Sequence, residues 1–166
     1  MVTFRCLLCA VALLPALACA DAGATFQREV IADFDEPWAL AFLPDERMLV
    51  TEKKGNLFVV ARDGARAGPV TGLPDVAYGG QGGLGDVALH PDFDDNGLVY
   101  LSYVESGSGD TRGAAVVRGV LATEGRRPAL RDVEVVWRQY PKVFGYGHYG
   151  HRLLFDDEGY LWIASG

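Results

Sequence analysis

The apolar residues of this chain come in short runs of four to six, and each run is bounded by Gly, Pro, Asp or Asn. Such runs are typical of β-strands, whereas an amphipathic helix would repeat apolar residues every three or four positions. No window of ten or more residues after residue 20 has that helical spacing. The pattern therefore predicts an all-β fold.

A phrase made of a strand, a polar turn and a second strand ending in Thr or Ser occurs three times. The copies lie at residues 40–51, 87–102 and 153–165. Each predicts a β-hairpin, and the equivalent residues Phe42, Leu89 and Phe155 are 47 and 66 positions apart. Units of about 40 to 50 residues with four strands are typical of β-propeller blades. The longer interval leaves room for an insertion at the Gly- and Ser-rich residues 106–109.

Three more apolar runs supply the remaining strands of these blades. Residues 56–60 and 115–121 are predicted as third strands, and residues 133–137 as a fourth. Since a propeller closes a ring of roughly 4 to 8 blades, the chain would form about three blades of an incomplete ring. We therefore expect the N-terminal part of a longer protein. The alternative is a complete small sandwich of two sheets.

The first 20 residues have the features of a secretory signal peptide. Arg5 supplies a positive charge, residues 6–14 form an apolar run, and small residues follow around Ala18 and Ala20, where cleavage is expected. The run is too short to cross a bilayer, which takes about 20 apolar residues. The sequence thus predicts a periplasmic or secreted protein. Its expected parts are a signal peptide at residues 1–20, a lead-in at residues 21–36 and a partial propeller at residues 37–166.

All three cysteines, Cys6, Cys9 and Cys19, fall within the predicted signal peptide. Cleavage after Ala20 would leave no thiol, so no disulfide framework is expected despite the oxidising destination. The residues around Cys19 loosely match a bacterial lipoprotein signal, which makes Cys19 a candidate lipid anchor.

The net charge of the chain argues against one class of partner, nucleic acid. Acidic residues outnumber basic ones by 22 to 15, giving a net charge of −7. No cluster of Lys and Arg is available to neutralise a phosphate backbone. We therefore expect no nucleic-acid partner.

Two Gly-rich stretches carry the candidate chemistry, and each precedes a copy of the hairpin phrase. Residues 78–86 contain Gln81, and residues 145–152 contain His148. Loops at equivalent places in successive blades surround the same end of a propeller, so both side chains could face one cavity. Imidazole titrates near neutral pH and can act there as a general base. The alternative is a pair of structural turns in which Gly supplies positive φ angles.

Other roles remain open for the second stretch. His148 and His151 could bind a metal ion with His90 as third ligand, since three nitrogen ligands are typical of catalytic zinc. His90 is expected outside the channel, however, and no metal ligand is assigned. Arg152 could form a salt bridge with a nearby acid such as Asp156.

Five motifs follow one another along the chain. They are Pro37-Trp38-Ala39-Leu40-Ala41-Phe42, Leu49-Val50-Thr51-Glu52, Gly80-Gln81-Gly82-Gly83-Leu84, His90-Pro91-Asp92-Phe93 with Val99-Tyr100-Leu101-Ser102-Tyr103, and His148-Tyr149-Gly150 with Arg152. In this order and spacing they resemble the soluble PQQ-dependent aldose sugar dehydrogenases, relatives of soluble glucose dehydrogenase. The resemblance extends from about Pro37 to Gly166.

The resemblance implies a six-bladed propeller that oxidises the anomeric hydroxyl of an aldose to a lactone and passes a hydride to the quinone of PQQ. His148 matches the family's catalytic base, and Gln81 matches a residue that binds cofactor and substrate. An external electron acceptor and a homodimer are further implied partners. The calcium ligands and the basic residues that hold PQQ are expected beyond residue 166, so the isolated chain is expected to be inactive.

Three positions depart from the family pattern. Gly147 stands where Asp or Asn usually precedes the histidine, His151 where Gly or Ser is usual, and Gly85 where Leu is common. These departures leave open a second function, a non-catalytic secreted propeller that binds a carbohydrate or a protein. A metal-dependent lactonase on a similar propeller is a third alternative, which would need carboxylates facing the channel.

Overall fold

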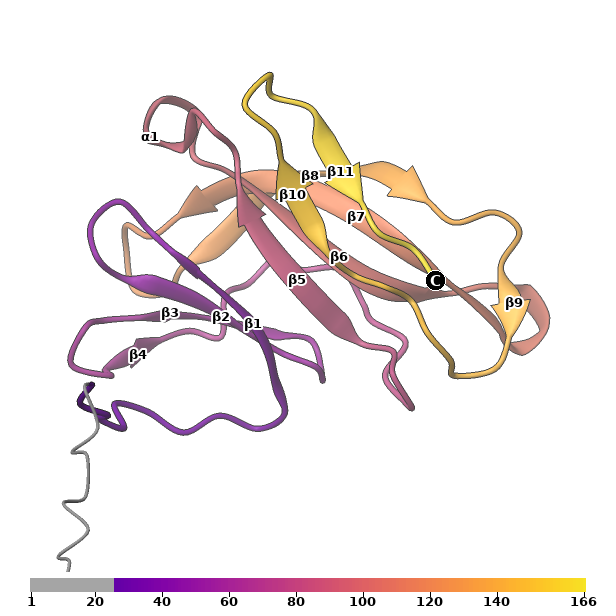
Figure 1. Cartoon of the computed structure of the whole chain (residues 1–166), viewed down its shortest axis with the longest axis horizontal. Coiled ribbons are helices and arrows are strands. Elements are labelled where there is room, and N and C mark those ends of the chain that lie inside the picture. The colour runs from indigo at the N-terminus through magenta and orange to yellow at the C-terminus, as the bar shows by residue number, and fades with distance from the viewer. Residues whose placement is uncertain (1–25) are drawn as a thin grey trace, which may run out of the picture.

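The computed structural model describes residues 26–166. The predicted signal peptide and the candidate lipid anchor Cys19 lie outside the described residues. The described chain consists of β-hairpins joined by turns, with one short α-helix and one 3₁₀ turn (Figure 1). None of its helices is long and apolar enough to cross a membrane.

The first sheet has four antiparallel strands in the order β1-β2-β3-β4. They are β1 (Pro37–Phe42), β2 (Met48–Glu52), β3 (Asn56–Val60) and β4 (Arg66–Ala67). The sequence predicts the positions of β2 and β3 closely. The first strand was expected to begin at residue 40, but β1 begins at Pro37 and ends at Phe42. It ends there because the chain turns: the Leu43 N–H donates to the Arg47 carbonyl oxygen at 2.8 Å, and Glu46 has a φ of 68°.

The second sheet is larger and runs in the order β5-β6-β7-β8, with β9 also paired to β7. Its strands are β5 (Leu84–Leu89), β6 (Leu98–Ser106), β7 (Thr111–Ala122), β8 (Ala129–Arg138) and β9 (Val143–Phe144). A single helical turn, α1 (Phe93–Asn96), joins β5 to β6. The predicted insertion at residues 106–109 forms the tip of the long β6–β7 hairpin.

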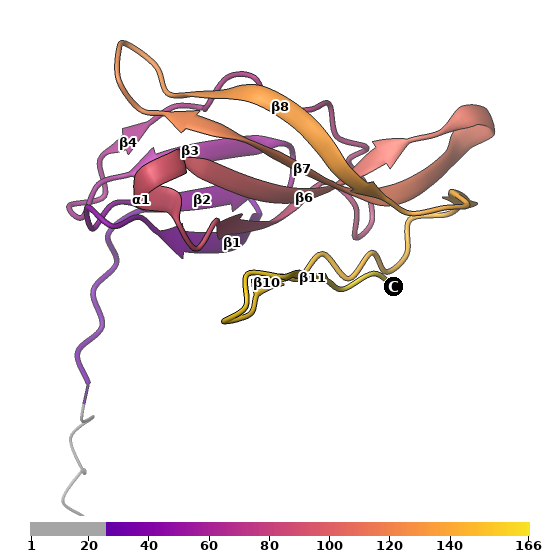
Figure 2. The same ribbon diagram turned by 90° about the horizontal axis from the view of Figure 1, so that it is seen from above.

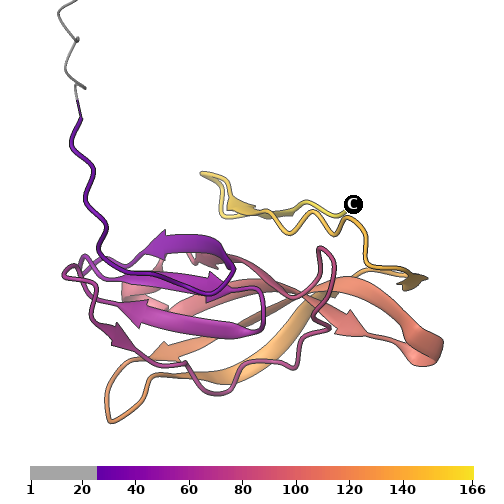
Figure 3. The ribbon, with the colours of Figure 1, turned by 90° about the horizontal axis from the view of Figure 1, so that it is seen from below.

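The third copy of the repeated phrase forms a hairpin of β10 (Leu153–Phe155) and β11 (Leu161–Ile163). It lies as a separate layer beside the second sheet (Figures 2 and 3). The first strand of each copy lies beside the next, since β5 contacts both β1 and β10. All three predicted hairpins are therefore confirmed. The chain forms a four-stranded blade, a second blade in which β9 adds a fifth strand, and the inner hairpin of a third, rather than a sandwich of two sheets.

The central strand β6 of the second sheet is buried on both faces, whereas β8 at its edge is mostly exposed. In β6, Val99 and Leu101 pack in a cluster shared with the first sheet, whereas Tyr100 packs in another with Leu153 of β10. Because successive side chains of a strand point to opposite faces, a strand covered on both sides needs apolar residues at consecutive positions. This explains the unbroken apolar run at the start of β6.

Large apolar side chains remain exposed on the two flanking sheets. On the first sheet they are Trp38, Leu40 and Phe42, and on the third hairpin Leu154, Tyr160 and Trp162. Each flanking sheet thus buries one face against the second blade and exposes apolar residues on its other face. In a propeller, such a face packs against the adjacent blade.

Candidate functional site

The Gln81 loop, residues 78–83, is a tight turn directly before β5. The Gly82 N–H donates to the Gly79 carbonyl oxygen at 2.8 Å. Gly79, Gly80 and Gly83 have φ values of 142°, 57° and 142°, which L side chains rarely adopt. A Cβ on Gly80 would also lie 2.4 Å from the Cβ of Tyr146. The glycines are therefore required by backbone geometry and by close contact with the second stretch.

The His148 loop, residues 145–151, lies against the Gln81 loop. The Gln81 N–H donates to the Tyr146 carbonyl oxygen at 3.0 Å. Tyr146 is itself held by Arg112, whose guanidinium carbon lies 4.0 Å from the ring centroid and whose Nη2 lies 3.1 Å from the hydroxyl. The structure thus brings together the two Gly-rich stretches that the sequence places at one end of the blades.

Both predicted site side chains, Gln81 and His148, are exposed. The His148 Cβ would be 3.2 Å from a Cβ on Gly166. At Gly147 a Cβ would meet no atom within 4 Å, so the main chain directly before His148 is open. An exposed amide and an exposed imidazole on adjacent loops are available to a ligand.

His151, only three residues further on, is almost fully buried. Its Nδ1 lies 3.2 Å from the Ser102 Oγ, and its ring packs edge-on against Trp38 at 5.3 Å. Burial lowers the pKa of His151 and outweighs the opposite effects of the nearby Gln81 backbone and of the Asp86 charge. The neutral imidazole is therefore the form that the fold favours.

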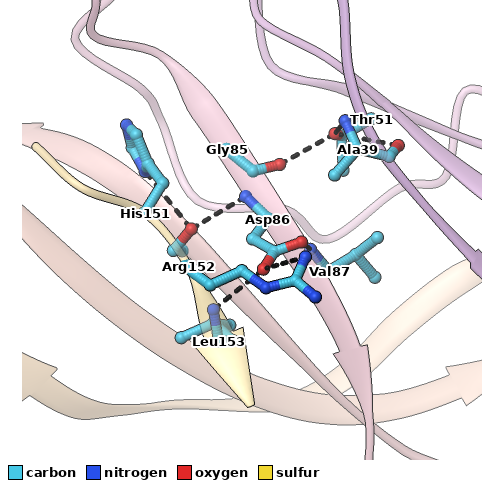
Figure 4. A network of polar contacts seen from close by, with 9 residues as sticks. Ala39, Thr51, Gly85, Asp86, Val87, His151, Arg152 and Leu153 are labelled. Atoms are coloured by element: carbon cyan, nitrogen blue, oxygen red, sulfur yellow. Dashed lines mark hydrogen bonds and ion pairs between the residues drawn. The ribbon is translucent and has the colours of Figure 1, made fainter. Parts of the chain in front are cut away.

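Two side chains connect the inner strands of successive blades (Figure 4). The Thr51 hydroxyl in β2 accepts from the Ala39 N–H at 3.0 Å and donates to the Gly85 carbonyl oxygen in β5 at 2.8 Å. Buried Asp86 in β5 accepts from the Leu153 N–H at the start of β10 at 2.8 Å. The loops of the site are thus built on strands that are held to one another by buried hydrogen bonds.

Arg152 pairs with an acid as predicted, but its partner is not Asp156. The Arg152 Nη1 lies 3.6 Å from Oδ2 of Asp86 instead. Asp156 accepts a hydrogen bond from Trp162 Nε1 at 2.7 Å and others from the turn between β10 and β11. Arg152 directly precedes β10 and Asp156 directly follows it, so the length of the strand separates the two side chains.

The three histidines lie in different surroundings. His90 packs against Tyr100 and Phe155, with ring centroids 6.2 and 5.5 Å away, whereas His151 is buried beside Trp38. Among residues 26–166, no group of three His, Cys, Asp or Glu side chains is placed to hold a metal ion.

Comparison with known proteins places this geometry in a family. The model of the Glucose / Sorbosone dehydrogenase family matches residues 34–166. The chain belongs to this family. Glucose/sorbosone dehydrogenase relatives include the Escherichia coli (strain K12) aldose sugar dehydrogenase YliI, which is 44% identical over 147 residues, covering 87% of this chain and 39% of that protein.

Two solved structures of the same family have similar folds. The apo form of the soluble aldose sugar dehydrogenase from Escherichia coli matches with a TM-score of 0.78 at 44% identity, over 83% of this chain and 40% of that one. The PQQ-bound aldose sugar dehydrogenase from Streptomyces coelicolor matches with a TM-score of 0.69 at 28% identity, over 84% and 40%. The chain therefore spans about two fifths of the length of these relatives.

Proposed function

We propose that the protein containing this chain oxidises the anomeric hydroxyl of an aldose to a lactone, with PQQ as the hydride acceptor. The observation that carries the proposal is the contact between the Gln81 and His148 loops, each of which carries an exposed candidate site side chain. The relatives support it, since two of them are named as aldose sugar dehydrogenases and one is PQQ-bound.

In this mechanism the chain's own residues orient the sugar and take up its proton. When bound, PQQ would supply the acceptor for the hydride, which carries both electrons of the oxidation. Neutral His148 would accept the proton of the anomeric hydroxyl as the C–H bond breaks, which leaves the product as a lactone. The Gln81 amide would donate a hydrogen bond toward the oxygen on which negative charge develops.

The described residues fit the quinone end of PQQ better than they fit its three carboxylates. Lys53, Arg112 and Arg152 lie beside the loops, and each already faces an acid. Lys53 Nζ is 3.5 Å from Glu36 Oε1, Arg112 Nη2 is 2.8 Å from Asp110 Oδ1, and Arg152 Nη1 is 3.6 Å from Asp86 Oδ2. Three carboxylates need further cations to be bound tightly. We infer that those cations, and calcium, are held by the part of the longer relatives that this chain does not cover.

The test uses the whole protein that contains this chain, loaded with PQQ and calcium. Aldose-dependent reduction of a dye should be measured for the wild type and for His148→Ala, which should lose about 10²- to 10⁴-fold in kcat, as expected for a general base. His90→Gln is the matched control, because His90 packs against Phe155 away from both loops, and it should retain activity.

Activity that survives in His148→Ala would refute the assignment of the base. A folded, PQQ-loaded protein that oxidises no aldose would refute the proposed reaction. That second result would favour the non-catalytic carbohydrate- or protein-binding propeller, for which the open main chain at Gly147 is the supporting observation.

A further inference from the structure

The side chain of Tyr146 contacts both the Gln81 loop and strand β7. An ideal Cβ on Gly79 would lie 3.0 Å from two carbons of the Tyr146 ring, and one on Gly80 would lie 2.4 Å from the Tyr146 Cβ. From β7, the guanidinium carbon of Arg112 lies 4.0 Å from the centroid of the same ring, and its Nη2 donates to the Tyr146 hydroxyl at 3.1 Å. One ring therefore connects the second sheet to the loops of the site.

The main chain on either side of Tyr146 has little packing of its own. A Cβ on Gly145 or on Gly147 would meet no atom within 4 Å. Glycines have the greatest backbone freedom to lose, so the contacts of Tyr146 have a large share in fixing this stretch. Further on, Tyr149 is buried with apolar residues of β6 and β7. His148 thus lies between one tyrosine that burial fixes and one that is exposed.

Arg112 is placed firmly enough to hold that exposed ring. It lies in β7, where it pairs with Ser106 of β6 on one side and with Val143 of β9 on the other. Its Nη2 also lies 2.8 Å from Oδ1 of Asp110, and only 14% of its side chain is exposed. A guanidinium has several donors in a rigid planar fork and stacks on aromatic faces, so this one side chain can bind the carboxylate, the ring and the hydroxyl together.

We propose that Arg112 is a positioning residue that fixes the two loops of the site through the ring of Tyr146. The Tyr146 carbonyl oxygen accepts the Gln81 N–H at 3.0 Å, so a displacement of Tyr146 moves the acceptor of the Gln81 backbone. The same displacement moves the main chain two positions before His148. The importance of both side chains for catalysis rests on the proposed function, whereas the positioning itself can be tested without activity.

The first test is hydrogen exchange in the whole protein without added PQQ. Arg112→Met keeps an aliphatic side chain and removes the guanidinium. The exchange of the Gln81 amide should become roughly 3- to 10-fold faster, as expected for the loss of a cation–π contact and one hydrogen bond. Arg66→Met is the matched control, because the Arg66 guanidinium carbon lies 5.0 Å from the Phe34 ring centroid and Arg66 is in β4, the outermost strand of the first sheet. It should leave the exchange of the Gln81 amide unchanged.

A double-mutant cycle separates an effect through the ring from a general loosening of the β6–β7 hairpin. Tyr146→Leu removes the ring and should also speed the exchange of the Gln81 amide. Because Arg112 acts through that ring, adding Arg112→Met to Tyr146→Leu should change the exchange by less than about twofold. Arg112→Lys keeps a cation that can lie over the ring, so it should recover part of the slow exchange.

The second test is activity with PQQ, calcium and an aldose. Arg112→Met should lower kcat about tenfold and change KM less, because misplacing a reacting group by about 1 Å is costly in rate. Arg66→Met should retain the wild-type kcat.

Unchanged exchange of the Gln81 amide in Arg112→Met would overturn the proposal, as would additive effects of the two substitutions in the cycle. An unchanged kcat in a protein that His148→Ala inactivates would overturn it as well. The proposed function fails independently. If the loaded protein oxidises no aldose while Arg112→Met speeds the exchange and the cycle shows coupling, Arg112 still positions the loops, but the loops do not serve that reaction.

Discussion

The hydroxyl of Thr51 donates a 2.8 Å hydrogen bond to the carbonyl oxygen of Gly85, across the junction between the first and second blades. Thr51 is fully buried and also accepts from the Ala39 N–H. Ser102 has the equivalent role at the next junction, where it accepts from the Asp86 N–H and contacts His151. Thr51 in β2 and Ser102 in β6 thus connect successive blades. The expectation that Ser102 ends its strand is wrong, because β6 continues to Ser106.

Thr51→Val should destabilise the protein by about 1 to 3 kcal/mol, because an isosteric methyl leaves the Ala39 N–H and the Gly85 carbonyl oxygen without this partner in a buried site. Denaturant unfolding measures the change. Thr71→Val, at an exposed residue, is the control and should change stability by less than about 0.5 kcal/mol. Equal losses in the two variants would contradict a special role for the junction.

Asp86→Asn should loosen the third hairpin from the second blade. Both carboxylate oxygens act as acceptors, Oδ1 for the Val87 N–H and Oδ2 for the Leu153 N–H, and an amide can replace only one of them. The attraction to Arg152 is lost as well. We expect faster hydrogen exchange at Leu153 and a stability loss of about 1 to 3 kcal/mol.

Asp157→Asn is the comparison for this variant, since Asp157 is exposed in the turn between β10 and β11. It should leave the exchange of the Leu153 amide as in the wild type. If Asp86→Asn also left it unchanged, the carboxylate would not be what holds β10 to β5.

The sequence predicts the three hairpins because each inner strand carries its own apolar run and turn residues. It does not predict β4 or β9, which have two residues each and form only by pairing with longer strands. The Gln81 and His148 loops are predicted from glycine content and repeat position. Their contact through Tyr146 depends on how the blades pack, which no local pattern encodes.

The contact between Gly85 and His151 is the clearest case of a relationship that sequence reasoning misses. In the sequence, Gly85 and His151 are two separate departures from the family pattern, 66 positions apart. In the structure they are in direct contact, and the missing side chain at one makes room for the ring at the other. Their equivalent positions before Leu89 and Phe155 are the signal that could have linked them.

The buried His151 should make stability depend on pH. Because burial lowers its pKa in the folded state, the unfolded chain binds a proton more readily than the folded chain. The stabilisation is complete above the unfolded pKa of about 6.5 and decreases as the pH falls from there toward the lowered folded pKa. Asp86, Arg152 and Tyr149 are the other titratable groups around the ring.

The difference in unfolding free energy between wild type and His151→Phe, measured from pH 8 to pH 4.5, isolates this contribution from those of the carboxylates. The wild type should lose more stability than the variant below about pH 6.5. If the unfolding free energy fell equally with pH in the two proteins, folding would not lower the pKa of His151.

Gly80→Ala should disrupt the contact between the two loops of the site. Gly80 has a φ of 57°, and a Cβ there would lie 2.4 and 2.5 Å from the Cβ and carbonyl oxygen of Tyr146. Gly109 offers a matched control, because its φ is 61° and a Cβ there would meet no atom within 4 Å. Both variants carry the same backbone cost of about 1 to 2 kcal/mol, so any further effect of Gly80→Ala comes from the displaced loop.

In the whole protein with PQQ and calcium, we expect aldose oxidation to fall at least about tenfold in Gly80→Ala and to persist in Gly109→Ala, because misplacing a reacting group by about 1 Å is costly in rate. Equal activities would mean that the Tyr146 contact does not set the geometry of Gln81 and His148.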